Sequence, residues 1–380
     1  MKVNKNRLSE SFKFLVEIDS ESKDEASICR ELKKILEEMG AETIVDNAGE
    51  KVGSNTGNLI ARFKGNVNVE PLLFNAHMDT VKPGKGVKAL LKNDIFTSKG
   101  KTILGADDKS AIAVLLETIN VIKEHNVPHG PIELVFTICE EIGLLGAKHL
   151  DFSLISSKIG YVLDTSNTES IVTRAPSSNK MVFKVYGKDA HSGIDPEKGI
   201  NAIHIASKAI ANLNMGRIDE ETSANIGVIE GGKASNIVPN FVRIEGEVRS
   251  HNESKLMKVT NEIVTTFKKT IEESQKAISN DSLPSVEIDI NKDFSSTNIP
   301  HDHHVVTLAR KAGENLNRKI LPSVTGGGAD ANIFFEKGII TGVLGTGMCE
   351  MHTSREYVKL DDLVKTAELV LEIVILHAGN

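Results

Sequence analysis

The sequence predicts an α/β protein with a mostly parallel, mixed sheet and a smaller α+β domain inserted into it. In residues 1–175, short apolar segments alternate with segments of helical periodicity, which is the order of a parallel sheet covered by helices. Residues 176–295 instead show the order βαββαβ, which is ferredoxin-like and can close into a small domain. The alternation of apolar and helical segments seen in residues 1–175 returns in residues 296–380. We therefore expect one larger domain, formed by residues 1–175 and 296–380, that carries the insertion.

The helices expected in the larger domain have their apolar residues on one face. In residues 24–39, for example, Ile28, Leu32 and Leu36 form one stripe, and Gly40 can end the helix. The same pattern predicts helices at residues 7–18, 24–39, 109–124, 144–150, 305–316 and 361–377. Short apolar runs predict strands at residues 42–45, 59–63, 132–138, 159–163 and 338–344, and residues 82–101 are loop and hairpin material.

The inserted domain has strands of alternating polarity, which is the pattern of half-buried strands. Its predicted strands are residues 181–185, 224–229, 242–248 and 286–290, and its predicted helices are residues 201–213 and 254–271.

Composition excludes several classes of function. Lys and Arg number 45 against 52 for Asp and Glu, so the net charge is −7. An acidic chain argues against nucleic acid as the main partner, because phosphate binding needs a basic patch. The three cysteines, Cys29, Cys139 and Cys349, form no Cys-x-x-Cys pattern, which fits a reducing compartment. Neither a signal-peptide core nor an apolar run of ~18 residues is found. We therefore expect a cytoplasmic protein with no membrane partner.

The sequence is organised around an apolar run at residues 71–74, which predicts a buried strand that ends at His77 and Asp79. Strand residues two apart point to the same side, so this imidazole and carboxylate leave the strand end together. Such a pair can supply a metal ligand and the carboxylate that fixes its orientation. Taken alone, such a pair favours a turn that has a polar edge; the acidic and histidine clusters that follow favour the metal site instead.

Two adjacent carboxylates, Asp107 and Asp108, precede the helix expected at residues 109–124. An acidic side chain at this position can cap the helix N-terminus. One carboxylate suffices as a cap, however, so the second is free to bind a metal.

A second pair, Glu140 and Glu141, follows the strand at residues 132–138. Adjacent carboxylates repel each other, so their burial requires a cation or protonation. A general base next to a metal ligand would meet that requirement. An exposed pair on a loop is the alternative.

Three further residues complete the set: Asp164 at the end of the strand 159–163, His352 beyond the strand 338–344, and His191 in the inserted domain. Each alone is a weak signal. Together, several strand-end clusters that supply two histidines and several carboxylates favour a two-metal hydrolytic site. The mixed N/O ligands suit two Zn²⁺ ions, with Co²⁺ or Mn²⁺ as possible replacements.

These residues, in this order, resemble the co-catalytic zinc peptidases that include peptidase T, carboxypeptidase G, aminoacylase and succinyl-diaminopimelate desuccinylase. The resemblance covers nearly the whole chain and is closest to peptidase T, through Gly105-Ala-Asp-Asp-Lys109 and His352-Thr-Ser-Arg-Glu-Tyr357. It implies a zinc-exopeptidase-like catalytic domain and an inserted lid and dimerisation domain.

The resemblance also implies the ligands of two zinc ions. His77, Asp107 and Asp164 would bind one, and Asp107, Glu141 and His352 would bind the other, with Asp107 bridging the two.

Further roles follow from the same resemblance. Asp79 would orient His77, Glu140 would be the general base, and the peptide bond before Asp108 would be cis. His191 would stabilise the oxyanion, in dimeric members in the active site of the partner subunit.

Two residues of the inserted domain match family positions that bind the carboxylate end of the substrate, namely Asn236 and Arg249. The fork of a guanidinium suits a carboxylate. The alternative for Arg249 is an ion pair with a neighbouring glutamate on a surface strand.

A glycine-rich loop, Gly326-Gly-Gly-Ala-Asp330, resembles the Gly-Gly-Thr-Asp substrate loop of the family, with Gly327 and Gly328 as its glycines. Ala329 departs from the family pattern by lacking the hydroxyl. A plain turn is the alternative.

We conclude from the sequence that this is a di-zinc aminopeptidase that acts on short peptides, with a homodimer formed through the inserted domain. The choice of aminopeptidase depends on Asp164, because carboxypeptidases and aminoacylases of the family have Glu there. An N-acyl-amino-acid or dipeptide hydrolase on the same fold is the alternative. A non-catalytic binding protein would predict a broken ligand set, and the set is complete.

Overall fold

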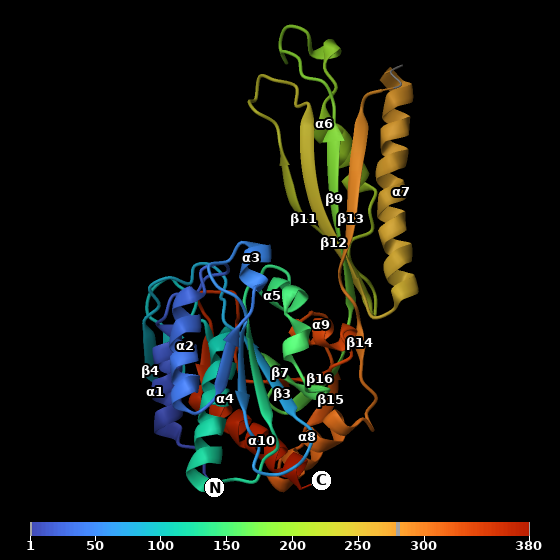
Figure 1. Ribbon diagram of the computed structural model, residues 1–380. Coiled ribbons are helices and arrows are strands. Elements are labelled where there is room, and N and C mark those ends of the chain that lie inside the picture. Colours follow the sequence, from blue (N-terminus) through green and yellow to red (C-terminus); the bar gives the residue numbers. More distant parts are fainter. Residues whose placement is uncertain (1, 279–281, 380) are drawn as a thin grey trace. The chain divides into compact units, whose positions relative to one another are not determined.

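The computed structural model describes residues 2–278 and 282–379, and the chain divides into two compact units (Figure 1). The first unit takes in the described residues of Met1–Arg174, Thr297–Thr325 and Ala329–Asn380. The second takes in those of Ala175–Ser296 together with Gly326–Gly328. Both segments of the second unit therefore lie between segments of the first along the chain.

The first unit is built on a nine-stranded sheet in the order β1-β2-β6-β3-β7-β16-β8-β14, with β15 paired to β8. The neighbours β6, β3, β7 and β16 are parallel, and antiparallel pairs lie on either side of them. The predicted mostly parallel, mixed sheet is thus confirmed. Its strands are β1 (Glu42–Val45), β2 (Leu59–Phe63), β3 (Leu72–His77), β6 (Ile132–Thr137), β7 (Ile159–Thr165), β8 (Ser170–Ala175), β14 (Thr297–Asn298), β15 (Leu321–Val324) and β16 (Ile340–Gly345).

The central strands are covered on both faces. Every residue of β3 and of β6 is buried. Successive side chains point to opposite faces, so Leu72 and Phe74 join one hydrophobic cluster and Leu73 joins another. A strand buried on both faces is a nearly continuous apolar run, which is why this stretch predicts a central strand.

Helices form the outer layers of the first unit (Figure 1). Residues of α1, α4, α8 and α10 belong to the larger hydrophobic cluster, whereas Ala331 and Phe334 of α9 belong to the cluster on the other face. The helix α4 contacts both α1 and α10. The helices are α1 (Lys5–Val16), α2 (Ala26–Glu38), α3 (Ala48–Val52), α4 (Ala106–His125), α5 (Leu145–His149), α8 (His304–Asn315), α9 (Asp330–Glu336) and α10 (Leu360–Ala378), with a 3₁₀ turn at Phe152–Leu154.

A separate three-stranded sheet in the order β17-β5-β4 also belongs to this unit. The strands β4 (Ala89–Lys92) and β5 (Ile95–Ser98) form a hairpin within the expected loop and hairpin region. The third strand, β17 (Tyr357–Lys359), follows the His352 loop and pairs with β5. This small sheet therefore anchors one end of the His352 loop.

The second unit is a five-stranded antiparallel sheet in the order β10-β11-β12-β9-β13, with α6 and α7 packed against it. Its core includes Phe183 and Phe267, whose rings stack with centroids 4.0 Å apart. The predicted βαββαβ order is confirmed, and β10 is an added edge strand. The elements are β9 (Ser177–Tyr186), a 3₁₀ turn (Pro196–Lys198), α6 (Ala202–Ala211), β10 (Gly216–Asp219), β11 (Thr222–Gly231), β12 (Phe241–Ser250), α7 (Glu253–Ile278) and β13 (Ser285–Phe294).

Several short elements are absent from the sequence prediction. The strand β8 contains Ser170, Thr173 and Arg174, so its local pattern is not that of an apolar strand, yet it is largely buried between its neighbours. The helix α9 has seven residues and follows a glycine-rich loop, which predicts a turn. Local pattern alone does not identify such elements, because tertiary burial stabilises them.

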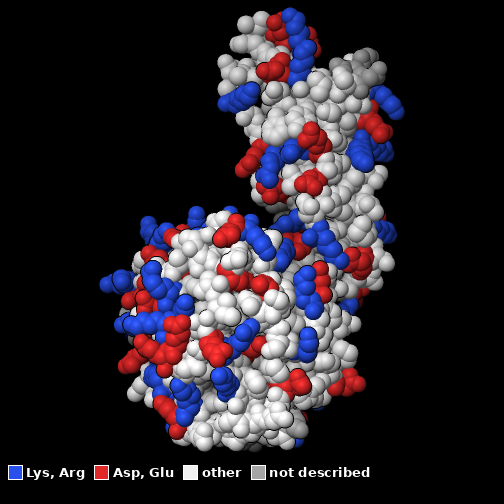
Figure 2. Space-filling view, in the orientation of Figure 1, with Lys and Arg blue, Asp and Glu red and all other residues white. Residues whose placement is uncertain are grey.

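The described surface carries mixed charge. On the face shown in Figure 2, basic and acidic side chains are interspersed. Lys5, for example, pairs with Asp94 at 2.9 Å and with Asp361 at 2.7 Å. Exposed pairs of this kind contribute little to the stability of a fold, because water and salt screen them. Among the helices of the described chain, none combines the length and apolar character needed to cross a membrane.

Candidate active site

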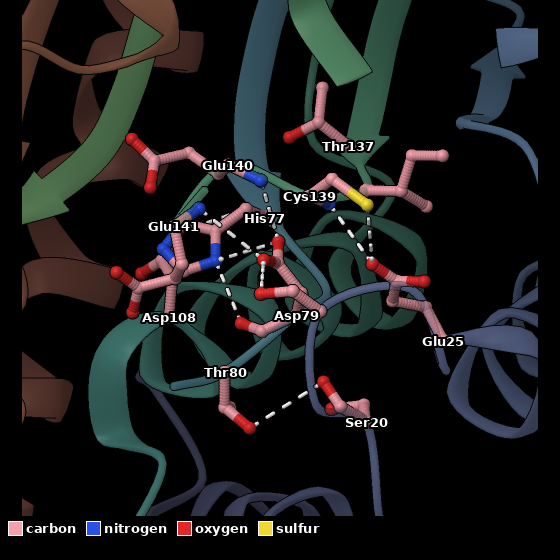
Figure 3. Close-up of polar contacts among 12 residues, drawn as sticks. Ser20, Glu25, His77, Asp79, Thr80, Asp108, Thr137, Cys139, Glu140 and Glu141 are labelled. Carbon is pink, nitrogen blue, oxygen red and sulfur yellow. Dashed lines mark hydrogen bonds and ion pairs between the residues drawn. The ribbon is translucent and has the colours of Figure 1, made fainter. Parts of the chain in front are cut away.

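The candidate site lies where the central parallel strands end. His77 is the last residue of β3, Glu140 and Glu141 follow β6, and Asp164 is near the end of β7. Because β6, β3 and β7 are parallel neighbours, their carboxyl ends meet at one edge of the sheet. Ligand sites of α/β sheets form at this edge. Figure 3 shows His77, Glu140 and Glu141 close together there.

Asp107 lies between two histidines. Its Oδ1 is 3.0 Å from Nε2 of His77, and its Oδ2 is 3.3 Å from Nε2 of His352. Nε2 of His352 is also 2.9 Å from Oε2 of Glu141. One carboxylate therefore contacts both imidazoles through its two oxygens.

Two groups of side chains have possible ligand atoms within 4.8 Å of one another: His77 with Asp107 and Glu141, and His77 with Glu140 and Asp164. Neutral imidazole and carboxylate oxygens are the donors that Zn²⁺, Mn²⁺ and Co²⁺ accept. Oε1 of Glu141 is buried and has no hydrogen-bond partner among the described residues. An unpaired buried carboxylate oxygen is a place for a cation, so these residues fit the expected metal ions.

The backbone at Asp107 and Asp108 is not helical, although both residues lie in the first turn of α4. The peptide bond between them is cis, as the resemblance implies. Both oxygens of Asp107 face histidines, Oδ2 of Asp108 accepts a hydrogen bond from the backbone N–H of His77 at 3.2 Å, and Oδ1 of Asp108 has no hydrogen-bond partner among the described residues. The capping alternative for this acidic pair is therefore wrong.

Asp79 contacts His77 mainly through its backbone. Nδ1 of His77 is 2.9 Å from the carbonyl oxygen of Asp79 and 3.5 Å from its carboxylate. The carboxylate accepts hydrogen bonds from the backbone N–H groups of Glu140 at 2.9 Å and Glu141 at 3.3 Å, and from Oγ of Ser22 at 2.7 Å. Asp79 thus connects the end of β3 to the turn that carries both glutamates (Figure 3).

A second buried carboxylate, Glu25, holds the residue before this turn. Its Oε1 accepts hydrogen bonds from the backbone N–H of Cys139 at 3.0 Å and from the Cys139 thiol at 3.3 Å (Figure 3). Sequence reasoning missed Glu25, because this residue lies 114 residues before Cys139 along the chain. No local signal identifies such a contact.

The acidic groups of the site disfavour full ionisation without a cation. Burial, with the charge of neighbouring carboxylates added, raises the pKa of Glu140 and Asp164 well above the ordinary value. Burial also raises the pKa of Glu141. The hydrogen bonds with Asp107 and Glu141 raise the pKa of His352 to about 10. A divalent cation would relieve this repulsion, and the histidines would then bind as neutral ligands.

The histidine and asparagine singled out in the second unit lie on two neighbouring loops, one after β9 and one between β11 and β12. The backbone carbonyl of Asn236 accepts a hydrogen bond from Ser192 N–H at 3.0 Å, and His191 forms a β-bridge with Ile237. The side chains of His191 and Asn236 are exposed.

Arg249 lies on β12 within the second unit. Its guanidinium donates to Glu247 at 3.1 Å and to the carbonyl of Gly326 at 3.4 Å, and it lies over the ring of Phe294 at 5.9 Å. Gly328 packs against that ring so closely that a Cβ would lie 2.4 Å from it. The ion pair with a neighbouring glutamate, which is the alternative for Arg249, is present, and the arginine also contacts the glycine loop.

A cluster of histidines and carboxylates at the carboxyl edge of a parallel sheet defines a metal-dependent hydrolase. The model of Peptidase family M20/M25/M40 matches residues 73–375, and the chain belongs to this family. The resemblance stated from the sequence is thereby confirmed.

Relatives of known and unknown function match nearly the whole chain. The chain is 41% identical over 373 residues to an uncharacterised Bacillus subtilis protein, YqjE, with 98% of each covered. It is 28% identical over 384 residues to peptidase T of Fusobacterium nucleatum, with 91% of this chain and 89% of that protein covered. Solved structures include an aminopeptidase PepT from Bacillus cereus (40% identity, TM-score 0.86) and a tripeptidase from Staphylococcus aureus (35%, 0.91), each with 100% of both chains covered.

Proposed function

We propose that this protein is a metal-dependent aminopeptidase that releases the N-terminal residue of short peptides, tripeptides above all. The observation that carries the proposal is the position of Asp107, whose two carboxylate oxygens contact His77 and His352. A carboxylate shared in this way suits two neighbouring cations. The aminopeptidase and the tripeptidase among the similar solved structures support the substrate class.

We assign the ligands as the sequence predicts them. His77, Asp107 and Asp164 would hold one ion, and Asp107, Glu141 and His352 the other, and we propose zinc, with Co²⁺ or Mn²⁺ as replacements. When bound, such ions lower the pKa of a water molecule and polarise the scissile carbonyl.

Glu140 is the proposed general base. It accepts a proton from the attacking water and delivers it to the nitrogen of the leaving amine, so that a C–O bond forms and the C–N bond breaks. Asp79 holds Glu140 through its backbone N–H. His191 is the proposed donor to the oxyanion.

The second unit carries the residues proposed to bind the peptide. Arg249 would bind the carboxylate end through its guanidinium fork, and Asn236, Gly327 and Gly328 would contribute polar contacts. The carbonyl of Gly326 within hydrogen-bond distance of Arg249 supports a shared role for the loop and the arginine. We propose that this unit is the lid domain, at about residues 176–295.

We also propose a homodimer through the second unit. Strand β10 pairs with only the first three residues of β11. Among the described residues, the rest of β11 is hydrogen-bonded to β12 along one edge, and its other edge is open. Val228 and Ile229 are exposed on that stretch. An open strand edge with apolar side chains is suited to pairing with a second copy. Sedimentation of wild type and of Ile229→Lys tests the proposed dimer. A fully active monomer at assay concentration would refute the dimer proposal.

We propose a cytoplasmic location, since the three cysteines are free and a reducing compartment keeps them so.

A mass-spectrometric product assay tests the proposed activity. Zinc- or cobalt-loaded protein would be incubated with a pool of free-amine dipeptides, free-amine tripeptides and N-acetylated amino acids. We expect tripeptides to lose their N-terminal residue while acetylated compounds persist. Cleavage of the acetylated compounds instead would assign the protein to the acylase branch. Protein treated with a chelator, and Glu140→Ala, are the controls, and both must be inactive.

A further inference from the structure

Glu356 is a buried carboxylate that binds a run of backbone N–H groups far away along the chain. Its Oε2 accepts hydrogen bonds from Leu104 and Gly105, each at 2.8 Å, and its Oε1 accepts one from Asp107 at 3.0 Å. The residue is 1% exposed. Hydrogen bonds from backbone N–H groups to a carboxylate are charge-assisted, and successive N–H groups form a concave site for an anion. Both oxygens of Glu356 are therefore committed to this segment.

The two segments that Glu356 joins each carry a proposed metal ligand. One ends at Asp107, and the other carries His352, four residues before Glu356. Asp107 and His352 belong to the same proposed ion site, in which their side chains already lie 3.3 Å apart. A carboxylate that fixes one segment relative to the other therefore fixes the spacing of two ligands.

The backbone of the His352 loop needs such support. Glu350 and His352 have φ values of 50° and 62°, in the left-handed region that is unfavourable for residues other than glycine. Within the loop, Thr353 Oγ1 donates to the carbonyl of Glu350 at 2.8 Å. The side chain of His352 is 55% exposed, so packing alone does not hold it.

Glu356 is itself attached to a regular element. Tyr357, the next residue, begins β17, and it exchanges backbone hydrogen bonds with Cys349 at 2.9 and 3.1 Å. Strand β17 pairs with β5. The Glu356 side chain thus links this small sheet to the segment that ends at Asp107.

We propose that Glu356 is a positioning residue, which sets the affinity and geometry of the ion site formed by Asp107, Glu141 and His352. The inference rests on the proposed function and extends it. Glu356 touches neither the substrate nor the reacting atoms in this assignment; it acts through the backbone of Asp107 and through its own loop.

The substitution Glu356→Gln tests the proposal with little change of volume. A glutamine amide keeps one oxygen and places an NH₂ group where the other oxygen was. That NH₂ group faces one or two backbone N–H donors and cannot accept from them. We expect the loop contact to loosen while the rest of the fold persists.

A matched control exists in the same unit. Glu133 is 2% exposed and, like Glu356, accepts hydrogen bonds from backbone N–H groups, those of Ser156 and Ser157, at 2.9–3.1 Å. It lies near the start of β6, whereas the candidate site follows the end of that strand. Glu133 also accepts from the hydroxyls of Ser156 and Ser157, each at 2.6 Å, and lies 3.8 Å from Arg62. Glu133→Gln therefore alters a buried, fully hydrogen-bonded carboxylate at the opposite end of β6 from Glu140 and Glu141.

The measurement is a Co²⁺ titration of the metal-free protein, followed by visible absorption and calorimetry. We expect wild type and Glu133→Gln to bind two equivalents with the same spectra and affinities. For Glu356→Gln we expect one equivalent to bind roughly 10–100-fold more weakly, with an altered d–d spectrum, as for other residues that orient metal ligands. Glu356→Asp, which keeps the charge but shortens the side chain, should fall between the two and serves if the glutamine variant does not fold.

Each outcome separates this inference from the proposed function. If Glu356→Gln binds both equivalents like wild type, or if Glu133→Gln loses affinity equally, Glu356 is not a positioning residue although the enzyme assignment stands. If wild type binds no metal, the site assignment and the inference both fail. Folding is checked for every variant by circular dichroism before titration.

Discussion

The carboxylate of Asp79 accepts a hydrogen bond from the backbone N–H of Glu140 at 2.9 Å, and its backbone carbonyl contacts Nδ1 of His77 at 2.9 Å. One residue therefore supports the proposed base through its side chain and a proposed ligand through its main chain. The two functions can be separated by mutation, because a substitution changes only the side chain.

We predict that Asp79→Asn mainly impairs Glu140. The asparagine keeps the backbone carbonyl that faces His77 but loses one of the two oxygens that accept from the Glu140–Glu141 turn. We expect kcat to fall roughly 10–100-fold, with less change in KM and in metal stoichiometry. Steady-state kinetics and metal analysis of purified protein measure this. Ser22→Ala removes the remaining donor to Asp79 and should change kcat far less; an equal loss in both variants would contradict the assignment.

Glu140 and Glu141 are adjacent, and we predict that the same substitution impairs the chemical step at Glu140 and metal binding at Glu141. Glu140→Gln should lower kcat by about 100- to 10,000-fold, because the proton acceptor is lost, while two metal equivalents still bind. Glu141→Gln should weaken one metal equivalent, because a proposed ligand is lost. Kinetics at saturating metal, together with metal titration, separate the two. Loss of metal in Glu140→Gln with retention in Glu141→Gln would reverse the roles.

Much of the site follows from local sequence. Apolar runs that end in acidic or histidine residues predict strand ends, and parallel neighbours bring strand ends together at one edge. The structure brings His77, Glu140 and Glu141 together in this way. The bridging role of Asp107 and the second-unit roles come only from the resemblance, because no period or spacing in the sequence contains them.

The remaining features depend on contacts between distant segments. Glu25 and Glu356 each bind backbone N–H groups more than 100 residues away, so no window of sequence reveals the bond. Gly326–Gly328 pack with the second unit although the flanking residues belong to the first. Predictions from local pattern fail at such places, since tertiary burial decides the structure there.

The buried carboxyl of Asp330 predicts a pH-dependent stability of the metal-free protein. Burial raises the pKa of Asp330 to about 6, against an ordinary value of 3.8, and Thr137 donates a hydrogen bond to it at 2.5 Å. The folded state therefore binds more protons than the unfolded state between pH 3.8 and 6. The contribution of this group to the free energy of unfolding is therefore present at low pH and is lost as the pH rises through that window.

We expect Asp330→Asn to reveal this loss. Relative to wild type, the variant should gain about 2 kcal/mol of unfolding free energy between pH 4.5 and pH 8, which follows from a shift of that size. Urea unfolding of chelator-treated proteins at the two pH values measures it. A difference between variant and wild type that is constant with pH would show that Asp330 has an ordinary pKa.

Arg249 provides the test of substrate orientation. Lysine keeps the charge but lacks the planar fork that binds a carboxylate through two N–H groups. We expect Arg249→Lys to raise KM for a tripeptide about tenfold with little change in kcat, which is the signature of lost uniform binding. A tripeptide amide, which has no terminal carboxylate, should bind wild type and variant equally weakly. Arg243→Lys is the matched control, because Arg243 lies on the same strand and pairs with Glu245 as Arg249 pairs with Glu247. Equal effects of the two substitutions, or an equal effect on acid and amide substrates, would assign Arg249 a structural ion pair instead.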